Sequence, residues 1–389
     1  LICIGSLLRY LNHRPPERWN EKLMILIPQA AGYCRLGQYA VYTRQYIRSH
    51  NIPDVAVLNL GMEEGFGGLG PNFAVNAWKS IVVTDVLDDI AVALRALAVD
   101  RDEALEVLNR ETELIRNRIE HGNSRSLYSR LRKSAAVLRQ IPLKQPYDET
   151  AQIAISGEFF VRKDPFSNLG LARRLADRGF VVKTAPMMEW MYYVNYMIKQ
   201  KMIQPKHTLA SWLEFRVTDA VQRHIERRIR RILAGSGLYH DEKIDVADLV
   251  RHSEHIPPKG FAGEPGLIAG LTLRDGLSEY GGVINVGPFG CMQTRFGDAM
   301  TAPHADLAGK RESLEHAGTK QDLSAFPEGS RIPYLAVESD GNPYPQLLEA
   351  RFESFCLQAE RAATRQGKRT APKDTAVARP APEPDAVLG

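Results

Sequence analysis

Two cysteines, Cys34 and Cys291, stand where a strand is expected to give way to a helix. Cys34 follows the apolar run 23–27 and a loop containing glycine, and Cys291 follows the apolar run 283–286 and a loop of glycine and proline. Ligands of open α/β sheets bind beyond the carboxyl ends of the strands. A helix N-terminus favours the thiolate, which is the form that binds iron. The pattern therefore predicts two metal-binding thiolates that face each other across an interdomain cleft.

The alternative is a structural role for each cysteine. A single cysteine near a strand end is commonly a small apolar side chain, and Cys34 and Cys291 are too far apart in the sequence to form a local ligand motif. The chain has four cysteines in 389 residues and no CxxC pair. This argues against a disulfide scaffold and favours a reducing, cytoplasmic compartment. Cys356 falls in an apolar helical pattern and is expected in the core, whereas Cys3 has no ligand context.

Charged side chains follow a third predicted strand. Glu158, Arg162 and Asp164 come soon after the apolar run 153–155, so we expect them at the same edge of the sheet as the cysteine loops. Arg162 has the geometry to pair with a phosphate or a carboxylate. The alternative is a capping role, because Asp164 precedes a proline that can open a helix. Glu189 follows another strand and is a further candidate for the edge of a pocket.

Apolar runs that alternate with helical patterns predict an α/β fold of two blocks. The first block covers residues 1–141 and ends in a helical cap, and the second covers residues 150–366. A polar segment at 142–149 contains proline and is predicted to be a linker. Residues 367–389 are rich in proline, alanine and charge and are predicted to form a disordered tail. The expected strands are 23–27, 55–60, 153–155, 180–184, 283–286 and 332–338. The expected helices are 38–50, 72–139, 168–178, 190–201, 208–234, 266–277 and 345–365.

The composition gives no sign of a nucleic-acid or membrane partner. The chain has 50 Lys and Arg against 46 Asp and Glu, a net charge of +4, so no extended basic surface is expected. The apolar run Leu1–Leu8 is far shorter than the roughly 20 residues that a membrane span needs. The basic segment Arg223–Arg231 is interpreted as a solvated helix face. His252 and His255 are interpreted as surface residues and not as ligands.

Four segments of the sequence resemble a known protein family. Gly32–Tyr39 (Gly-Tyr-Cys-Arg-Leu-Gly-Gln-Tyr) is similar to a Gly-Pro-Cys-Arg-Phe-Gly-Gln-Tyr signature, and Val286–Met292 contains a Gly-Pro-Phe-Gly-Cys-Met loop. Gly157–Asn168 and the closing strand at 332–340 are similar to two further stretches of the same family. The family is that of 2-hydroxyglutaryl-CoA dehydratase-like proteins and the large CoA-substrate-specific enzyme activases. The four matches occur in order along most of the chain.

The resemblance implies two flavodoxin-like (Rossmann-like) parallel-sheet domains with helical insertions and an iron–sulfur cluster in the cleft between them. Cys34 and Cys291 would be ligands of a [4Fe–4S] or double-cubane cluster. Hydrogen bonds near cluster sulfurs tune the reduction potential. The further residues expected around the cofactor are Arg35, Gln38, Tyr39, Glu158 and Arg162.

The resemblance also implies a function in low-potential electron transfer. The electrons would come from an actin-like ATPase activase domain or subunit, and the acceptor would be a CoA ester in a 2-hydroxyacyl-CoA dehydratase-like lyase or an ATP-dependent reductase. Two cysteines supply half of the four thiolates of a cubane cluster, and the chain does not begin with methionine. The other ligands and the ATPase domain are therefore expected upstream. The chain departs from the family at Tyr33, where proline is usual, and at Gln293.

Two other functions stay open at this point. The chain could be a non-catalytic scaffold that docks the activase. It could also be a nucleotide-binding α/β enzyme, because Gly65–Gly70 matches the GxGxxG pattern. That match lacks the surrounding strand–helix–strand context that makes the pattern specific.

Overall fold

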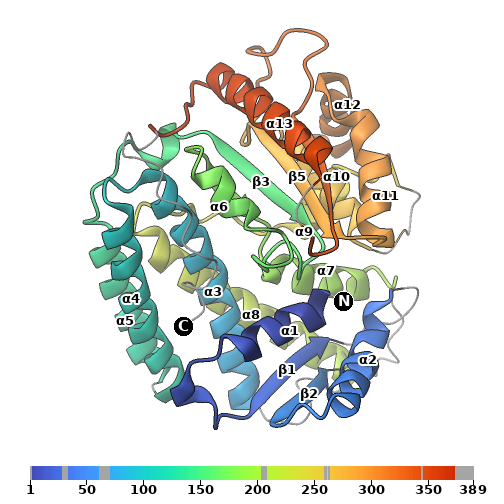
Figure 1. Ribbon diagram of the computed structural model, residues 1–389. Helices are drawn as coiled ribbons and strands as arrows, with labels where there is room; N and C mark the ends of the chain where they lie inside the picture. The colour runs from blue at the N-terminus through green and yellow to red at the C-terminus, as the bar shows by residue number, and fades with distance from the viewer. Residues whose placement is uncertain are drawn as a thin grey trace. The chain divides into compact units, whose positions relative to one another are not determined.

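The computed structural model describes residues 2–28, 34–60, 71–121, 123–202, 208–257, 261, 263–342 and 345–372. The chain forms two compact units, one containing Leu1–Ala77 and the other Trp78–Lys373 (Figure 1). This division differs from the linker predicted at 142–149, which lies inside the second unit. Both units contain parallel strands and helices, so the α/β class predicted from the sequence is confirmed.

The first unit contains two parallel strands joined by a helix. The strands are β1 (Leu23–Pro28) and β2 (Val55–Leu60), and Leu23 pairs with Val55. Helix α2 (Leu36–Ser49) connects them, and its buried residues Ala40, Thr43 and Ile47 recur at the three- and four-residue spacing of one helix face. The predicted strand–loop–helix–strand element is therefore confirmed. Helix α1 (Ile2–Asn12) precedes it and was not predicted.

Three helices follow: α3 (Pro71–Leu97), α4 (Arg101–His121) and α5 (Ser124–Leu138). They divide the single helical stretch predicted at 72–139 into three. The Asn123 side chain accepts a hydrogen bond from Ser126 N at 2.9 Å, and Ser126 Oγ accepts one from Asn123 N, which makes a reciprocal cap for α5. The buried Glu111 of α4 accepts a hydrogen bond from Ser134 Oγ of α5 at 2.7 Å.

The second unit is built on a four-stranded parallel sheet in the spatial order β4-β3-β5-β6. The strands are β3 (Gln152–Gly157), β4 (Val181–Thr184), β5 (Gly282–Pro288) and β6 (Tyr334–Ser339). The chain runs outward from β3 to β4, returns past β3 to β5, and then continues outward to β6. The direction of strand order therefore reverses between β3 and β5. Every residue of β3 is buried, as expected for a parallel sheet that is covered on both faces.

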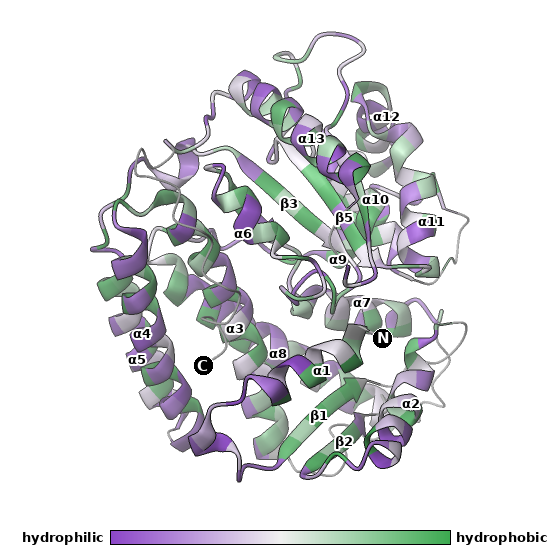
Figure 2. Cartoon of the chain, viewed as in Figure 1, coloured by the Kyte–Doolittle hydropathy of each residue, from purple (hydrophilic) through white to green (hydrophobic). Residues whose placement is uncertain are grey.

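Helices surround this sheet. In Figure 1, α6 and α13 pass in front of the strands, and Figure 2 shows apolar colour concentrated on β3 and β5. Helix α9 (Val246–Arg251) and helix α12 (Leu307–Ala317) were not predicted. The helices of this unit after α5 are α6 (Leu171–Ala176), α7 (Met187–Lys199), α8 (Leu209–Ala234), α9, α10 (Pro265–Asp275), α11 (Met292–Thr301), α12 and α13 (Gln346–Arg365).

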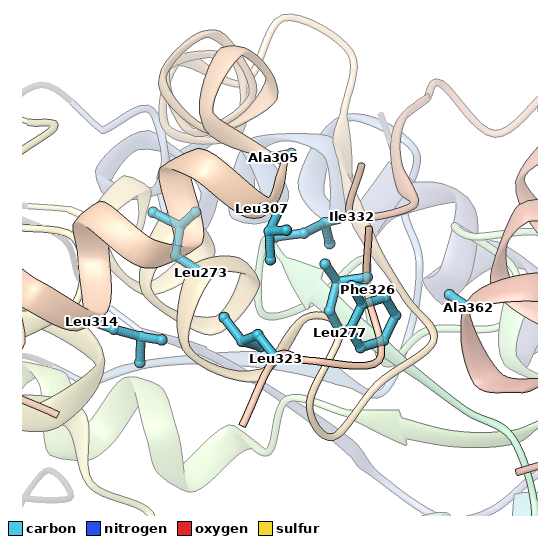
Figure 3. Packing of buried hydrophobic residues seen from close by; sticks show 9 residues of the cluster. All are labelled: Leu273, Leu277, Ala305, Leu307, Leu314, Leu323, Phe326, Ile332 and Ala362. Atoms are coloured by element: carbon cyan, nitrogen blue, oxygen red, sulfur yellow. The ribbon is translucent and has the colours of Figure 1, made fainter. Parts of the chain in front are cut away.

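One compact apolar cluster joins α10, α12 and the segments around β6 (Figure 3). Its side chains are almost fully buried, and Ile256 and Tyr334 pack against it. Cys356, which was expected in the core, is also buried. The members of the cluster are Leu273, Leu277, Ala305, Leu307, Leu314, Leu323, Phe326, Ile332 and Ala362.

Three interpretations of polar segments need correction. The tail predicted to begin at 367 is bonded into the unit as far as Ala371, whose N–H donates to Gly179 O at 2.8 Å; residues 373–389 lie outside the described part of the chain. Arg230 was assigned to a solvated face, but it is buried and bonded to Glu226 and Tyr239. His252 was assigned to the surface, but it is buried. None of the helices within the described ranges is long and apolar enough to cross a membrane.

Candidate functional site

The candidate site of the second unit begins at the carboxyl ends of β3 and β5, where the strand order reverses. Gly157 is the last residue of β3 and pairs with Val286. The N–H of Glu158 donates to Val286 O at 2.9 Å. Gly157 has φ +114°, and a Cβ atom here would lie 2.0 Å from Val286 O, so glycine is required. The loops that leave these two strands therefore start side by side at the position where open α/β sheets bind ligands.

The loop after β5 places Cys291 at the N-cap position of α11. Cys291 is partly exposed, and its N–H donates to Pro288 O at 3.0 Å. Asn285 of β5 holds the helix in place by donating to Thr294 O at 3.2 Å and to Asp298 Oδ1 at 2.6 Å. The predicted strand, loop, cysteine and helix are thus confirmed in this unit.

The loop after β3 folds back on itself around Arg162. The guanidinium of Arg162 donates to Gly157 O at 3.0 Å and to Pro186 O at 2.9 Å, and it lies 3.4 Å from Glu189 Oε1. Arg162 is only 4% exposed, and its Nε is buried without a hydrogen-bond partner in the structure. Arg162 therefore ties the end of β3 to the start of α7, and it lies inside the protein at the base of the site.

The positive charge of Arg162 acts on three carboxyl groups. They belong to Glu158, which follows β3; Glu189, in the first turn of α7; and Glu264, which precedes α10. Burial raises the pKa of all three carboxyls, and the positive charge of Arg162 partly opposes the effect. Glu158 Oε2 also accepts a hydrogen bond from Val161 N at 2.8 Å.

The surroundings of Glu264 raise the pKa of its carboxyl well above the usual range. Burial, followed by repulsion from Glu158 and Glu189, raises the pKa of Glu264 to about 8. The protonated form of this carboxyl is therefore favoured relative to that of an ordinary glutamate. A protonated carboxyl beside ionisable partners is the arrangement that general acid catalysis uses, and such displaced groups gather at functional sites.

The carboxyls of Glu264 and Glu158 also affect the pKa of the Cys291 thiol. Burial raises its pKa, hydrogen bonds from the backbone and side chain of Thr294 lower it, and the carboxyls of Glu264 and Glu158 raise it. The net direction is upward, so the thiol form is favoured. A helix N-terminus alone would have favoured the thiolate. A bound metal ion deprotonates a coordinating thiol outright, so the raised pKa does not prevent coordination.

Asp164 caps a turn and not a helix, because the next helix, α6, begins only at Leu171 with Gly170 as its N-cap. The carboxylate of Asp164 accepts hydrogen bonds from Ser167 N at 3.1 Å and from Ser167 Oγ. Asn168 supports the same turn, because its amide donates to Val161 O at 2.8 Å and to Arg162 O at 3.2 Å. Asp164 therefore shapes the loop that holds Arg162.

Cys34 belongs to the first unit. It is partly exposed and lies just before α2, and Arg35 occupies the N-cap position of that helix. Arg35 and Gln38 are exposed, Tyr39 is partly exposed, and Gln38 N donates to Arg35 O at 2.9 Å in the first turn. Cys34 and Cys291 thus lie in comparable places, because Cys34 directly precedes the N-cap residue of α2 and Cys291 is the N-cap residue of α11.

One site residue was missed from the sequence. Glu264 lies in the segment Gly263-Glu264-Pro265, and Pro265 is the first residue of α10. Proline at the first helical position is a recognised start signal, so the glutamate before it could have been placed at a helix N-terminus. Nothing local in the sequence indicates that this terminus lies beside Glu158.

No group of three His, Cys, Asp or Glu in the described ranges has the geometry of a metal site. The loop Gly65–Gly70, considered for nucleotide binding, lies outside those ranges. The sequence and the structure were compared with known proteins. No family model, curated protein or solved structure matches the chain.

Proposed function

We propose that this chain is an iron–sulfur redox module of the 2-hydroxyacyl-CoA dehydratase and activase family, with Cys34 and Cys291 as cluster ligands. The cofactor would be a [4Fe–4S] or double-cubane cluster. Its partner would be an actin-like ATPase that delivers low-potential electrons, and the acceptor would be a CoA ester.

One observation carries this proposal. The segments Gly157–Asn168 and Val286–Met292 resemble the family separately and lie far apart in the sequence, yet they adjoin in the fold. The hydrogen bond from Glu158 N to Val286 O connects them, and the carboxyls of Glu158 and Glu264 influence the Cys291 thiol. Two segments selected by resemblance alone therefore form a single site around a cysteine.

The strand order of the second unit supports the flavodoxin-like assignment. Numbered within the unit, the order β4-β3-β5-β6 is 2-1-3-4. Flavodoxin-like sheets begin with this order and bind their cofactor at the switch between strands 1 and 3. In this unit the switch lies between β3 and β5, at the loops that carry Glu158 and Cys291.

The donor set fits a cluster in part. Cys291 offers a partly exposed sulfur to which Thr294 donates hydrogen bonds, as second-shell groups do around cluster sulfurs. Cys34 offers a second sulfur, and the other two ligands of a cubane must come from elsewhere. The cluster, when bound, supplies single-electron transfer.

The chain's own residues would supply proton transfer. The raised pKa of Glu264 favours its protonated carboxyl, so it can protonate a leaving hydroxyl group of a 2-hydroxyacyl substrate. The positive charge of Arg162 partly opposes the rise in the pKa of the neighbouring carboxyls, and its hydrogen bonds fix the end of β3 and the start of α7. Around Cys34, we assign Arg35, Gln38 and Tyr39 to the surroundings of the cluster.

The test is a cluster analysis under anaerobic conditions. The chain would be purified together with its upstream region, and iron, acid-labile sulfide and visible absorbance would be measured for the wild type, Cys34→Ala and Cys291→Ala. The matched control is Cys356→Ala, because Cys356 is a buried core residue. We expect cluster loss in the first two variants and an unchanged iron content in the control.

Two results would overturn the ligand assignment. One is wild-type protein without iron, which would leave the scaffold that docks an activase as the better interpretation. The other is an unchanged iron content in Cys34→Ala or Cys291→Ala. Circular dichroism of each variant separates loss of the cluster from loss of the fold.

A further inference from the structure

A polar pocket lies against one face of the four-stranded sheet. Its volume is about 60 Å³, and it is lined by residues of β3, β4 and the helices α3, α7, α8, α9 and α10 within the second unit. Ala154 of β3 and Lys183 of β4 line it from the sheet. They are partners in the strand register, so their side chains lie on the same face. Because the side chain of Ala154 is small, it leaves space between the sheet and the helices.

The outer end of the pocket lies at the segment between α8 and α9. Glu242 and Lys243 of this segment line the pocket and are exposed to solvent. The ammonium of Lys243 pairs with Asp245, the N-cap residue of α9. Water can therefore enter the pocket beside these charged side chains.

The inner end of the pocket is the carboxyl group of Glu189. Glu189 lines the pocket but is only 4% exposed, and its Oε1 lies 3.4 Å from Arg162 Nη1. The same guanidinium acts on the carboxyls of Glu158 and Glu264. The pocket therefore leads from an exposed segment to the buried charges beneath the candidate site.

Ionised side chains line the pocket between its two ends. Lys183 Nζ lies 2.9 Å from Asp89 Oδ2, and Arg274 Nε lies 2.7 Å from Asp275 Oδ1. Such groups have further donors and acceptors to satisfy, and water molecules fill that role in proteins. The pocket has room for about four of them, since each needs roughly 15 Å³. Proton transfer to a carboxyl group can pass through an intervening water molecule.

We propose that this pocket is the route by which solvent protons reach Glu189, which is the proton-exchanging residue at its inner end. The proton that the Glu189 carboxylate gains is lost by a hydronium ion in the pocket, which becomes water. Protonation of Glu189 removes a negative charge that repels the charge of Glu264. The consequence for catalysis by Glu264 rests on the proposed function, whereas the route itself does not.

The test follows the exchange of the carboxyl proton by infrared spectroscopy. The whole chain would be transferred into D₂O, and the C=O band of its protonated carboxyls, which deuteration shifts, would be recorded over time. The pH is chosen so that Glu189→Gln removes part of the band, and that part reports on Glu189. Glu264→Gln identifies the part that belongs to Glu264.

Two variants fill the pocket. Ala154→Val adds methyl groups on the sheet, and Ala185→Val adds them at a second buried alanine of the lining. We expect each to slow the exchange at Glu189 by about tenfold or more, because exchange must then wait for local opening of the fold. Circular dichroism shows which variants are folded, and either folded variant is sufficient for the test.

The matched control is Ala336→Val. It makes the same change on β6, outside the residues that line the pocket, and should exchange as the wild type does. None of these measurements needs a bound cluster. A wild type without iron would therefore refute the cluster proposal and leave the exchange result as it stands.

Either of two outcomes would overturn the proposal. One is an equal exchange rate at Glu189 in the wild type and in a folded Ala154→Val or Ala185→Val variant, which would show that protons arrive by another path. The other is a band from which Glu189→Gln removes nothing at any pH at which the chain is folded, because Glu189 then takes up no proton.

Discussion

Arg162 Nη1 lies 3.4 Å from Glu189 Oε1, and the two side chains are only 3% and 6% exposed. This ion pair joins the loop after β3 to the first turn of α7, beneath the candidate site. Because water is excluded from it, each charge depends on the other and on the backbone carbonyls that Arg162 also reaches.

Removing the positive charge should therefore be costly. We expect Arg162→Met to lower the free energy of unfolding by about 3–5 kcal/mol, because it leaves a buried carboxylate unpaired. The comparison is Arg311→Met, which breaks an exposed pair with Glu328 at 2.7 Å and should cost about 1 kcal/mol or less. Urea unfolding measures both values, and equal losses would contradict the buried role of Arg162.

The close approach of β3 to β5 at Gly157 leads to a second prediction. Gly157→Ala forces a Cβ atom into Val286 O at a φ of +114°, so we expect a loss of at least about 3 kcal/mol from strain and overpacking together. Gly237→Ala also has a positive φ, of +73°, but has open space for a Cβ atom, and it should lose about 1–2 kcal/mol. A thermal melt that ranks the two variants in the opposite order would show that the strand ends separate easily.

The raised pKa of Glu264 gives a third prediction, on the pH dependence of stability. Its carboxyl binds a proton more tightly in the folded chain than in the unfolded chain, whose pKa is about 4.3. The folded state therefore holds the extra proton between about pH 4.3 and about pH 8, and stability should fall as pH rises through that window.

Glu264→Gln should flatten this fall and should stabilise the chain most at the alkaline end. The pKa of Glu158 and that of Glu189 are also raised, so the stability of the variant should still fall somewhat as pH rises. Urea unfolding at several pH values from 5.5 to 8.5 checks the effect, with Glu328→Gln as an exposed control. An identical slope in the wild type and Glu264→Gln would refute the assignment of the buried proton.

Thr294 gives a fourth prediction, on the reactivity of Cys291. Its backbone and side chain donate hydrogen bonds that lower the pKa of the thiol, so Thr294→Val should raise that pKa and slow alkylation of Cys291 at pH 8. Mass spectrometry of the Cys291 peptide after iodoacetamide treatment follows the rate. Thr364→Val, a change at an exposed helix position, should leave the rate unchanged, and faster alkylation in Thr294→Val would contradict the prediction.

The sequence predicted the strands well because parallel strands covered on both faces are continuous apolar runs. Residues 153–155 and 283–286 lie inside β3 and β5, and the loop after each strand was correctly located. The order of the strands is a long-range property. No local pattern around Glu264 indicates that α10 begins beside the loop that follows β3.

The linker prediction shows where composition misleads. The segment 142–149 is polar and contains proline, yet Tyr147 is buried in an apolar cluster with Val181 and Ala371. The amide of Gln145 donates to Thr150 Oγ1 at 2.8 Å and to Arg369 O at 3.1 Å. The second of these partners, Arg369, lies 224 residues further along the chain, so the sequence around Gln145 gives no sign of it.

The pairing of Thr150 with Arg369 has a consequence for the modularity of the chain. The polypeptide enters the four-stranded sheet and leaves its last helix at one place, where Ala151 N donates to Arg369 O at 2.8 Å. A fold whose entrance and exit adjoin can be inserted into a surface loop of another protein, or circularly permuted, without changing its core. Transfer of the segment from Thr150 to Ala371 would need helix α3 as well, because Ala93, Ala96 and Leu97 of α3 pack in the same core as Val181 and Ala371.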